Sequence, residues 1–591
     1  MLAQLIRWLK QALPIASWLP DYERADLRGD AMAGLTVGVM LIPQGMAYAV
    51  IAGVPPIYGL YAGLLPLLTY PLFGTSRHLA IGPTAIDMLI VAAGVGALAE
   101  AGTPRYVALA IMLTAMVGLV QIGMGLARLG FVANLLSRPV ITGLTTAAAL
   151  IIAASQLGNL MGIDLGRSQY VYVMIEEAVR RAGETHWASL GVGVGSVALL
   201  LGLQRWTPLL PGALIAVIVG ELVSWGFGLR EMGVVVIGSI PSGLPPLEWP
   251  LLGASEVRSL VPAAITLALV QFMNVVSLGR VFATRHNYAI DPNRELIGVG
   301  AANLFGSFFR SVPTSGSFSR SAVNERSGAR TAMANICAAV VIGLALLFLT
   351  PLFYYLPMPV LGAIILVAGM GLVDIGELRD LFRAKRRDGA VALFTALSVL
   401  AIGIQEGILL GVLATIVVVL YRVSRPNVAE LGHVPGTRLF RDLDRFDQAV
   451  RIAGILVLRV DAAFSFANAE YFKDFILEKS EREGRRIEVV VIDGTSINDL
   501  DTTATDAIRS VIEALEERGI ELYFTGLIGP VREVMVRSGL FDELGGEHFQ
   551  MGPHDAVVHV LEQWDEEDGG DRVPRYFAKT EKETKPTPAG S

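Results

Sequence analysis

The sequence predicts a multi-span α-helical membrane protein with a small α/β domain at its C-terminal end. Of its 591 residues, 53% are hydrophobic and only 17% are charged, and the mean hydropathy is +0.55. This is more apolar than a typical soluble protein. From residue 430 onward, 19 Lys and Arg face 32 Asp and Glu, a net charge of −13, while residues 1–429 carry +6. Because charge and hydropathy change together, we place a domain boundary near residue 430.

The first 25 residues are expected to form a cytosolic or interfacial segment. Arg7, Trp8, Lys10 and Trp18 are spread through a weakly apolar stretch. This stretch lacks the compact apolar run and the small-residue cleavage site of a signal peptide. A helix lying at the membrane surface fits this pattern better.

Residues 26–429 are predicted to form a transmembrane domain. Apolar stretches of about 20 residues, the length that crosses a bilayer, recur throughout it, and some are shorter or broken. We expect fourteen spans, at residues 31–50, 55–73, 79–98, 106–127, 139–160, 188–204, 209–227, 260–279, 296–307, 309–326, 332–351, 358–373, 389–404 and 407–423.

Basic residues in short loops predict the orientation of these spans. The loops around Arg285, Arg326 and Arg386 are rich in Arg and Lys and should be cytoplasmic. They share one side of the membrane if the N-terminus is inside, and an even number of spans then leaves the C-terminus inside as well. The prediction is a multi-pass protein of the cell inner (plasma) membrane with both termini in the cytoplasm.

Two of the predicted spans are interrupted at corresponding places. In residues 77–87 and 309–321, a short run that favours extended backbone is broken by proline and small residues, and a new helix then begins at membrane depth. Paired broken helices of this kind mark substrate sites in secondary transporters. The two are the third and tenth spans, so a seven-span repeat of odd parity would place the second copy upside down.

An inverted repeat would point the N-termini of the two half-helices toward each other. Each N-terminus carries roughly half a positive charge from its peptide dipoles, together with free N–H donors. The pair therefore predicts an anion site near the membrane midplane. The alternative is that proline and glycine only kink packed helices, and two breaks at equivalent positions argue against it.

Several motifs resemble the SulP family of sulfate-permease anion transporters. Residues 56–63 read Pro-Ile-Tyr-Gly-Leu-Tyr-Ala-Gly and are followed by Leu-Thr-Tyr at 68–70 and Gly-Thr-Ser-Arg at 74–77. Residues 43–49 are similar to the family's first span, residues 316–324 to its tenth, and residues 291–298 to the loop that enters its ninth. The resemblance extends from about residue 15 to residue 565.

The resemblance implies a uracil-permease-like fold of 7+7 inverted spans, divided into a core and a gate domain and usually dimeric. It implies an elevator-like transport mechanism with the anion held between half-helices three and ten. Carried over residue by residue, the implied substrate-binding residues are Gln44, Tyr48, Thr84, Ala85, Ser317, Phe318, Ser319 and Arg320.

Five of the implied site residues also have a plainer structural interpretation. Gln44 and Tyr48 share a helix face, but either could form a helix–helix hydrogen bond instead. Ser317 and Ser319 could be caps at a helix start. The guanidinium of Arg320, which costs roughly 2.5–3.5 kcal/mol inside a span, could extend to the cytoplasmic interface rather than attract an anion.

Two residues depart from the family pattern and concern ion coupling. Many bacterial members resemble Phe-Thr-Glu-Ala-Ile-Ser in the eighth span, and here Asn274 stands in the place of the acid. Asp87 instead lies one turn into the third half-helix, where it fits a capping box with Thr84. The functional hypothesis is that Asp87 titrates or pairs with Arg320, so that its protonation frees the site. The coupling ion, H⁺ or Na⁺, stays undetermined.

Residues 437–565 are predicted to form a cytosolic α/β domain. Strands at 455–460, 487–492 and 522–525 alternate with helices near 468–480 and 503–517. The turn after the second strand resembles the STAS domain, where a serine at this position can be phosphorylated. Thr502 and Thr503 take that place here, although a capping role explains them equally well. Residues 566–591 are polar and expected to be disordered.

No motif predicts an enzyme, a cofactor, a metal site or nucleic-acid binding. The leading expectation is a secondary active transporter of a small anion, with sulfate first and bicarbonate or a C4-dicarboxylate behind it. A passive anion channel, a nucleobase permease and a membrane-anchored signalling scaffold remain the alternatives. Expected partners are the lipid bilayer, a second copy of the chain and a cytosolic regulatory protein at the STAS domain.

Overall fold

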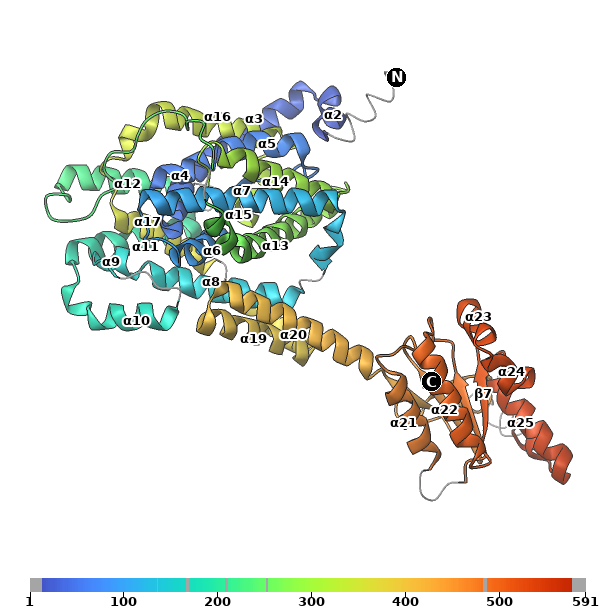
Figure 1. Ribbon diagram of the computed structural model, residues 1–591. Coiled ribbons are helices and arrows are strands. Elements are labelled where there is room, and N and C mark those ends of the chain that lie inside the picture. The colour runs from blue at the N-terminus through green and yellow to red at the C-terminus, as the bar shows by residue number, and fades with distance from the viewer. Residues whose placement is uncertain are drawn as a thin grey trace, which may run out of the picture. The chain divides into compact units, whose positions relative to one another are not determined.

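The computed structural model describes residues 13–134, 137–165, 170–207, 211–250, 253–371, 373–481 and 486–576. The chain divides into two compact units, Met1–Thr415 and Ile416–Ser591. Figure 1 shows the first as a bundle of helices and the second as a smaller α/β domain. Residues 1–12 and 577–591 lie outside the described residues. The prediction of a disordered tail is wrong for residues 566–576, because the helix Pro553–Asp568 extends into them and Val573 and Tyr576 pack against the second unit.

Each of the fourteen predicted spans contains at least one helix. The helices concerned are α3 (Arg24–Ala52), α4 (Pro56–Tyr61), α5 (Leu65–Phe73), α6 (Ala85–Gly96), α7 (Pro104–Leu126), α8 (Arg138–Ser155), α9 (Leu157–Met161), α11 (Trp187–Trp206), α12 (Gly212–Phe227), α13 (Ala254–Arg285), α14 (Pro292–Ser307), α15 (Phe318–Arg326), α16 (Met333–Leu344), α17 (Met358–Met370), α19 (Arg386–Ile402) and α20 (Ile404–Ser424). Among the described residues, nine helical stretches are long and apolar enough to cross a membrane, and α6 and α12 are shorter apolar helices. Fourteen crossings stay a prediction.

Short helices that the sequence did not predict lie between the spans, namely α10 (Val171–Arg180) and α18 (Ile375–Ala384). Helix α2 (Ile15–Trp18) lies in the N-terminal segment, where the sequence predicts a helix. In α10, Met174 and Ala178 are buried four residues apart, while Glu176, Glu177 and Arg180 leave the opposite face polar. This one-sided pattern is typical of a helix that packs along a surface.

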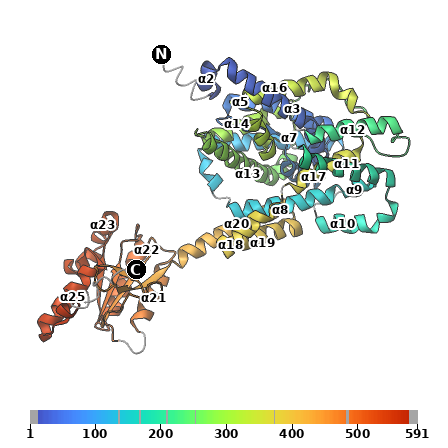
Figure 2. The same ribbon diagram turned by 180° about the vertical axis from the view of Figure 1, so that it is seen from behind.

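The helices of the first unit pack into two bundles. The first bundle contains α3 to α7 and α13 to α16, and the second contains α8, α9, α11, α12, α17 and α19. Figure 2, the reverse view, shows α8 beside α19 and α13 beside α14. Contacts of α3 with α12 and α17, and of α6 with α8, join the two bundles. The broken segments, which hold α6 and α15, both belong to the first bundle.

Two features of the motif at residues 56–77 are explained by packing in the first bundle. A Cβ atom on Gly59 would lie 1.9 Å from the carbonyl oxygen of Gly45, so only glycine allows α4 to approach α3 this closely. The buried carboxylate of Glu295 accepts hydrogen bonds from the Tyr70 hydroxyl at 2.7 Å and from the Thr75 hydroxyl and N–H at 2.6 Å. The motif therefore locks α3, α4, α5 and α14 together.

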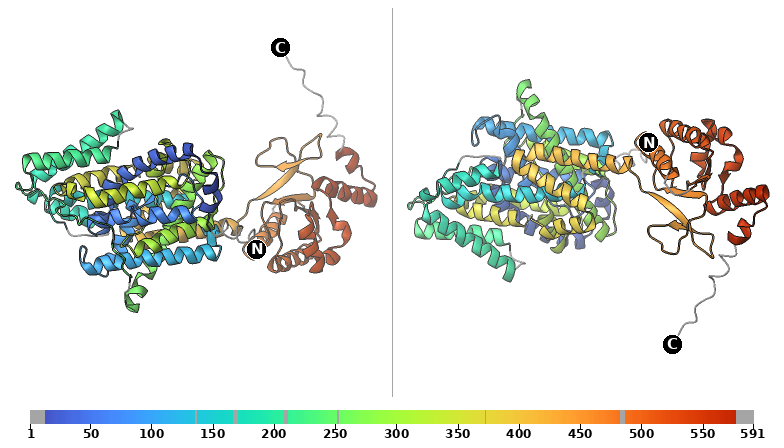
Figure 3. Two further views of the ribbon diagram at one scale, coloured as in Figure 1. Left: turned by 90° about the horizontal axis from the view of Figure 1, so that it is seen from above. Right: turned by 90° about the horizontal axis from the view of Figure 1, so that it is seen from below.

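The second unit contains a six-stranded sheet in the order β4-β3-β5-β6-β7-β8. The predicted strands are present as β5 (Ile455–Val460), β6 (Val489–Asp493) and β7 (Glu521–Thr525), all parallel, and the predicted helices as α21 (Ala469–Ser480) and α22 (Thr502–Glu516). The sequence did not predict β3 (Val428–His433), β4 (Phe440–Asp442), β8 (Phe549–Gln550), α23 (Gly529–Arg537), α24 (Leu540–Leu544) and α25 (Pro553–Asp568). Figure 3 shows this sheet with helices beside it.

Apolar clusters cover both faces of this sheet. Leu458, Phe472 and Ile512 belong to one cluster and Val457, Tyr523 and Leu561 to the other. Strands buried on both faces read as nearly continuous apolar runs, which is why β5 and β6 are evident in the sequence. The antiparallel hairpin of β3 and β4 is short and mixed in polarity, so it carries no such signal.

Two buried histidines give the α/β domain an expected dependence on pH. His433 and His554 are 3% and 8% exposed, and burial lowers the pKa of both imidazoles below the usual value of about 6.5. His433 Nε2 lies 2.7 Å from the Thr437 carbonyl oxygen, and His554 Nδ1 lies 3.0 Å from the Tyr576 hydroxyl.

We predict that the free energy of unfolding of this domain falls as the pH drops below about 6.5, because the unfolded chain then binds protons that the folded one excludes. Thermal melts of residues 426–576 between pH 8 and pH 5 measure this slope. The double variant His433→Gln, His554→Gln should flatten it. An unchanged slope in the double variant would show that other groups are responsible.

Candidate functional site

The two broken segments meet at the centre of the first bundle. Strand β1 (Ile81–Gly82) pairs antiparallel with strand β2 (Ser315–Gly316), with Ile81 opposite Gly316 and Gly82 opposite Ser315. The Ser317 N–H extends this pairing by donating to the Ala80 carbonyl oxygen at 3.2 Å. Helices α6 and α15 begin within three residues of these strands, so both helix N-termini lie beside the strand pair, as the sequence predicts.

The two helix starts are capped differently. Thr84 has extended backbone, and its hydroxyl accepts from the Asp87 N–H at 3.4 Å, so it caps α6. Ser317 is also extended, but its hydroxyl lies 3.3 Å from that of Ser319 and caps no backbone group of α15. The prediction that Ser317 acts as a cap is therefore wrong. The first-turn N–H groups of α15 lack a side-chain partner and can serve an anion.

Arg320 lies in the first turn of α15 and is completely buried. A Cβ atom on Gly82, whose φ is +152°, would lie 3.1 Å from Arg320 Nη2, so the guanidinium rests against the strand pair. Within the described residues, none of its three nitrogens has a hydrogen-bond partner. The alternative in which Arg320 extends to the interface is therefore wrong.

Gln44 and Tyr48 bring the first span to the same place. Both are 7% exposed and lie one turn apart on α3, which packs against α6 and α15. Within the described residues, Gln44 Oε1 accepts no hydrogen bond, so that oxygen takes part in no helix–helix hydrogen bond. The first span thus places an amide and a phenol, both neutral hydrogen-bonding groups, on a helix that contacts the two half-helices.

The remaining predicted site residues range from buried to open. Ala85 is 8% exposed, Thr84 is half-buried, Ser319 is exposed and Phe318 is 61% exposed. These residues lie in or next to the starts of α6 and α15, and along α15 the exposed Phe318 and Ser319 precede the fully buried Arg320.

Asp87 is fully buried but does not complete the predicted capping box. Its Oδ2 accepts a hydrogen bond of 2.5 Å from the Ser315 hydroxyl, which ties α6 to β2. Its Oδ1 has no partner among the described residues. Asp87 and Arg320, both described, form no ion pair within 4 Å in this arrangement, so the predicted pairing stays a hypothesis.

A buried amide network that the sequence analysis missed adjoins Asp87. Asn303 Nδ2 donates to Gln121 Oε1 at 3.1 Å and to Gln271 Oε1 at 2.9 Å, and Asn303 Oδ1 accepts from the Thr314 N–H at 2.8 Å. Gln271 Nε2 has no hydrogen-bond partner among the described residues, and this side chain neighbours Asp87. The sequence signal was available, because carboxamides within apolar spans are uncommon.

The network changes the role expected for the eighth span. Asn274 is only half-buried, whereas Gln271, three residues earlier on the same helix α13, is fully buried. Gln271 is therefore the side chain of α13 that joins the buried amide network, whose Asn303 accepts from the backbone just before β2. Asn274, at the position of the family's acid, remains a coupling candidate by sequence alone.

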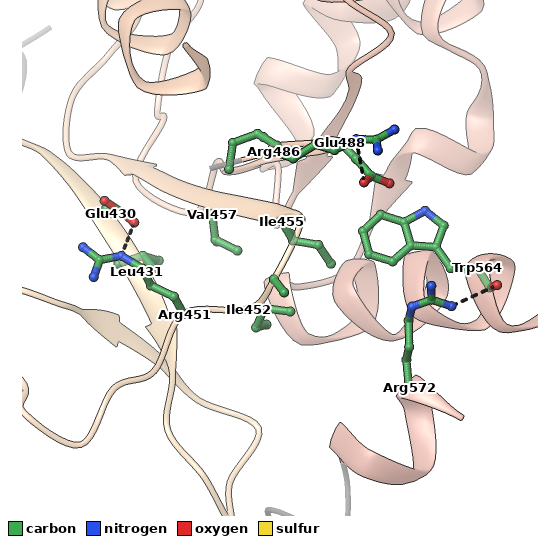
Figure 4. A pocket seen from close by; sticks show the side chains of 13 residues that line it. Glu430, Leu431, Arg451, Ile452, Ile455, Val457, Arg486, Glu488, Trp564 and Arg572 are labelled. Atoms are coloured by element: carbon green, nitrogen blue, oxygen red, sulfur yellow. Dashed lines mark hydrogen bonds and ion pairs between the residues drawn. The ribbon is translucent and has the colours of Figure 1, made fainter. Parts of the chain in front are cut away.

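The α/β domain contains a separate cleft of about 660 Å³ at one end of its sheet. Figure 4 shows Arg451, Arg486, Arg572 and Trp564 around it, with Glu430 and Glu488 beside two of the cations. Arg451 pairs with Glu430 at 2.7 Å and Arg486 with Glu488 at 3.3 Å. These guanidiniums already have carboxylate partners, unlike that of Arg320.

Thr502 and Thr503 lie exposed in the first turn of α22. Asp501 caps this helix by accepting from the Ala504 N–H at 2.9 Å. The interpretation of the threonines as caps is therefore wrong, and both hydroxyls are accessible.

Two half-helices that start beside a buried guanidinium, inside a bundle of membrane-length helices, define an anion transporter and not an enzyme. The family profile described as "Sulfate permease family" matches residues 27–395, and that described as "STAS domain" matches residues 448–556. The chain belongs to the sulfate permease family.

Relatives and a solved structure agree with this assignment. The chain is 33% identical to "Sulfate transporter 4.1, chloroplastic" of Arabidopsis thaliana over 95% of its own length and 84% of the relative's. It is 36% identical to "Probable sulfate transporter MT1781" of Mycobacterium tuberculosis, with 91% and 97% covered. The murine Solute Carrier 26 family member A9 anion transporter in its inward-facing state is 25% identical, with a TM-score of 0.86 and 94% and 95% covered.

We predict that Arg320→Ala raises the half-saturating sulfate concentration of uptake roughly 10- to 100-fold, the equivalent of about 1.5–3 kcal/mol for hydrogen bonds from a charged group. Uptake of radiolabelled sulfate into proteoliposomes measures the change. Arg326→Ala, an exposed position on the same helix, should behave as the wild type. Equal half-saturation in Arg320→Ala and the wild type would exclude a binding role.

Proposed function

We propose that the protein carries out secondary active transport of sulfate, bound between the N-termini of α6 and α15. The observation that carries the proposal is the fully buried guanidinium of Arg320, whose nitrogens have no protein partner among the described residues. A buried cation of this kind is costly unless an anion accompanies it. Gln44, Tyr48, Thr84 and the first-turn N–H groups of α15 supply neutral donors around that anion.

Sulfate is the substrate proposed because it is the anion named for the family and for both curated relatives described above. A tetrahedral dianion can accept hydrogen bonds from several directions at once. That suits donors that arrive from α3, α6 and α15 around one strand pair.

The division into two bundles supports an elevator-like movement. Gln44, Thr84 and Arg320 all belong to the first bundle, so an anion bound to them would travel with it against the second bundle. The inward-facing state of the murine relative supports an inward-facing assignment for the arrangement described here.

We propose further that both termini are cytoplasmic, that the protein is a homodimer of the plasma membrane, and that modification of Thr502 or Thr503 regulates it.

Coupling is assigned to Asp87. This carboxyl is buried, is bonded through one oxygen to Ser315, and lies within electrostatic reach of Arg320. An ionised Asp87 would weaken the attraction of Arg320 for an anion, and a protonated Asp87 would not. A proton bound at Asp87 would therefore accompany the anion.

We predict that purified protein in sealed vesicles concentrates sulfate above its electrochemical equilibrium when an inward proton gradient is imposed. A channel cannot do this, and uptake that stops at equilibrium would contradict secondary active transport. Competition by bicarbonate, succinate and uracil, measured at fixed pH with and without sodium, ranks the alternative substrates and tests the coupling ion.

We predict that Asp87→Asn makes sulfate uptake independent of pH between pH 5.5 and pH 8, because the amide mimics the protonated acid. Wild-type uptake should rise as the pH falls over this range. Initial rates at matched membrane potential measure the profile. Ser315→Ala serves as a control that removes the hydrogen bond but keeps the titrating group, and a wild-type pH profile in the Asp87→Asn variant would refute the role of Asp87.

A further inference from the structure

The segment that joins α12 to α13 touches both helical bundles. Residues 228–250, called here the connecting segment, contain no helix beyond short turns, and Figure 1 shows them as a long trace that leaves α12. Connections in compact domains usually have about 4–6 residues, and much longer ordered ones are commonly functional.

One part of the connecting segment is fastened to the second bundle by backbone bonds. Val236 and Pro357 form an antiparallel bridge. The Ile237 N–H donates to the Leu356 carbonyl oxygen at 2.9 Å, and the Met358 N–H donates to the Val235 carbonyl oxygen at 2.9 Å. Met358 is the first residue of α17, which packs within the second bundle. This attachment resembles a strand pairing, so it should persist when the bundles move.

The other part of the connecting segment is fastened to the first bundle. The Glu248 N–H donates to the Phe308 carbonyl oxygen at 2.8 Å, and the Glu248 carboxylate forms an ion pair with Arg310. Trp249 packs edge-on against Phe308 with ring centroids 5.0 Å apart. Phe308 and Arg310 immediately follow α14, which packs on α5 and α7 of the first bundle.

Arg310 stands where a helix terminus usually has glycine. Its φ is +55°, in the left-handed region, and the Ser311 N–H closes the end of α14 by donating to the Gly306 carbonyl oxygen at 3.0 Å. Glycine adopts this conformation without steric cost, whereas a residue with a side chain does not. The backbone therefore gains nothing from arginine here, and the contribution of Arg310 comes from its side chain, which meets Glu248 and neighbours Tyr58 and Tyr61.

We propose that Glu248 and Arg310 are positioning residues for transport. Their ion pair, called here the latch, attaches the connecting segment to the first bundle. It thereby favours the arrangement described here over the opposite-facing one. The inference rests on the proposed movement of the first bundle against the second. The segment is attached to both bundles, so the movement strains its weakest attachment. The side chains of Arg310 and Glu248 are 36% and 54% exposed, and exposed ion pairs are weak and reversible, so this ion pair is the contact that opens first.

The test uses the full-length protein in proteoliposomes, with radiolabelled sulfate applied on the side of the connecting segment. Glu248→Gln and Arg310→Gly should each lower the half-saturating sulfate concentration roughly two- to fivefold, because the opposite-facing state gains population. Arg310→Gly is chosen since glycine suits the local backbone and the variant should fold. The charge exchange Glu248→Arg, Arg310→Glu should restore the wild-type value. Glu231→Gln removes a charge from the same segment away from Arg310 and should change nothing.

A second measurement does not depend on transport. In a Cys337→Ala background, cysteines placed at the exposed positions Trp225 on α12 and Phe305 on α14 carry spin labels, one on each bundle. Glu248→Gln should shift population by the same two- to fivefold factor between two label distances, and the charge exchange should reverse the shift.

The proposal is overturned if Glu248→Gln and Arg310→Gly keep both the wild-type half-saturation and the wild-type distance distribution, or if the charge exchange restores neither. If Arg320→Ala weakens uptake in the same vesicles while the latch variants match the wild type, the anion site stands and only the latch fails. If wild-type vesicles take up no sulfate, the proposed substrate fails and the label distances still decide the latch.

Discussion

The arrangement of the first bundle depends on keeping one guanidinium buried. Arg320 is the largest fully buried side chain of the described chain, and no protein atom there accepts from its nitrogens. Such a charge is tolerated inside a protein only where dipoles and an anionic partner compensate it. The N-termini of α6 and α15 lie beside it, and the strand pair β1 and β2 fixes their position. The same feature that is costly for folding is therefore the one on which the proposed anion site depends.

Hydrogen bonds that involve Glu295 and Asn335 keep this strand pair in place. The buried carboxylate of Glu295 accepts hydrogen bonds from the Tyr70 hydroxyl and from the backbone N–H groups of Thr75 and Ser76. These residues lie just before the chain enters β1. Asn335 donates to the Leu79 carbonyl oxygen at 2.8 Å, which ties α16 to the same stretch. Because both ends of the extended run are anchored, the helix that follows begins at a defined depth. Much of the motif at residues 56–77 is thus explained by support of the site and not by contact with substrate.

Asp87 and the amide network give the site a second polar layer. Gln121, Gln271 and Asn303 are fully buried and bonded to one another, and Asn303 also holds the backbone of Thr314 just before β2. Gln271 Nε2 has no hydrogen-bond partner among the described residues, so this network keeps one free donor near Asp87. The site therefore contains a buried carboxyl although Asn274 stands at the position of the family's acid on the eighth span.

The sequence by itself determined the class of fold, the helix that lies in every predicted span, the two broken segments and the α/β domain with strands β5, β6 and β7. These features are encoded by hydropathy, by proline and small residues, and by runs of β-branched residues, all of which act locally along the chain. Through the family resemblance it also pointed to Arg320, in the motif similar to the tenth span, and to Asp87, as a departure from the family pattern.

The tertiary structure alone decided what those side chains touch. It showed that Arg320 is buried instead of reaching an interface, that Asp87 bonds to Ser315 instead of completing a cap, and that Gln271, not Asn274, is fully buried and joins the network of Gln121 and Asn303. Each of these depends on contacts between residues more than a hundred positions apart, and no local pattern in the chain specifies such contacts.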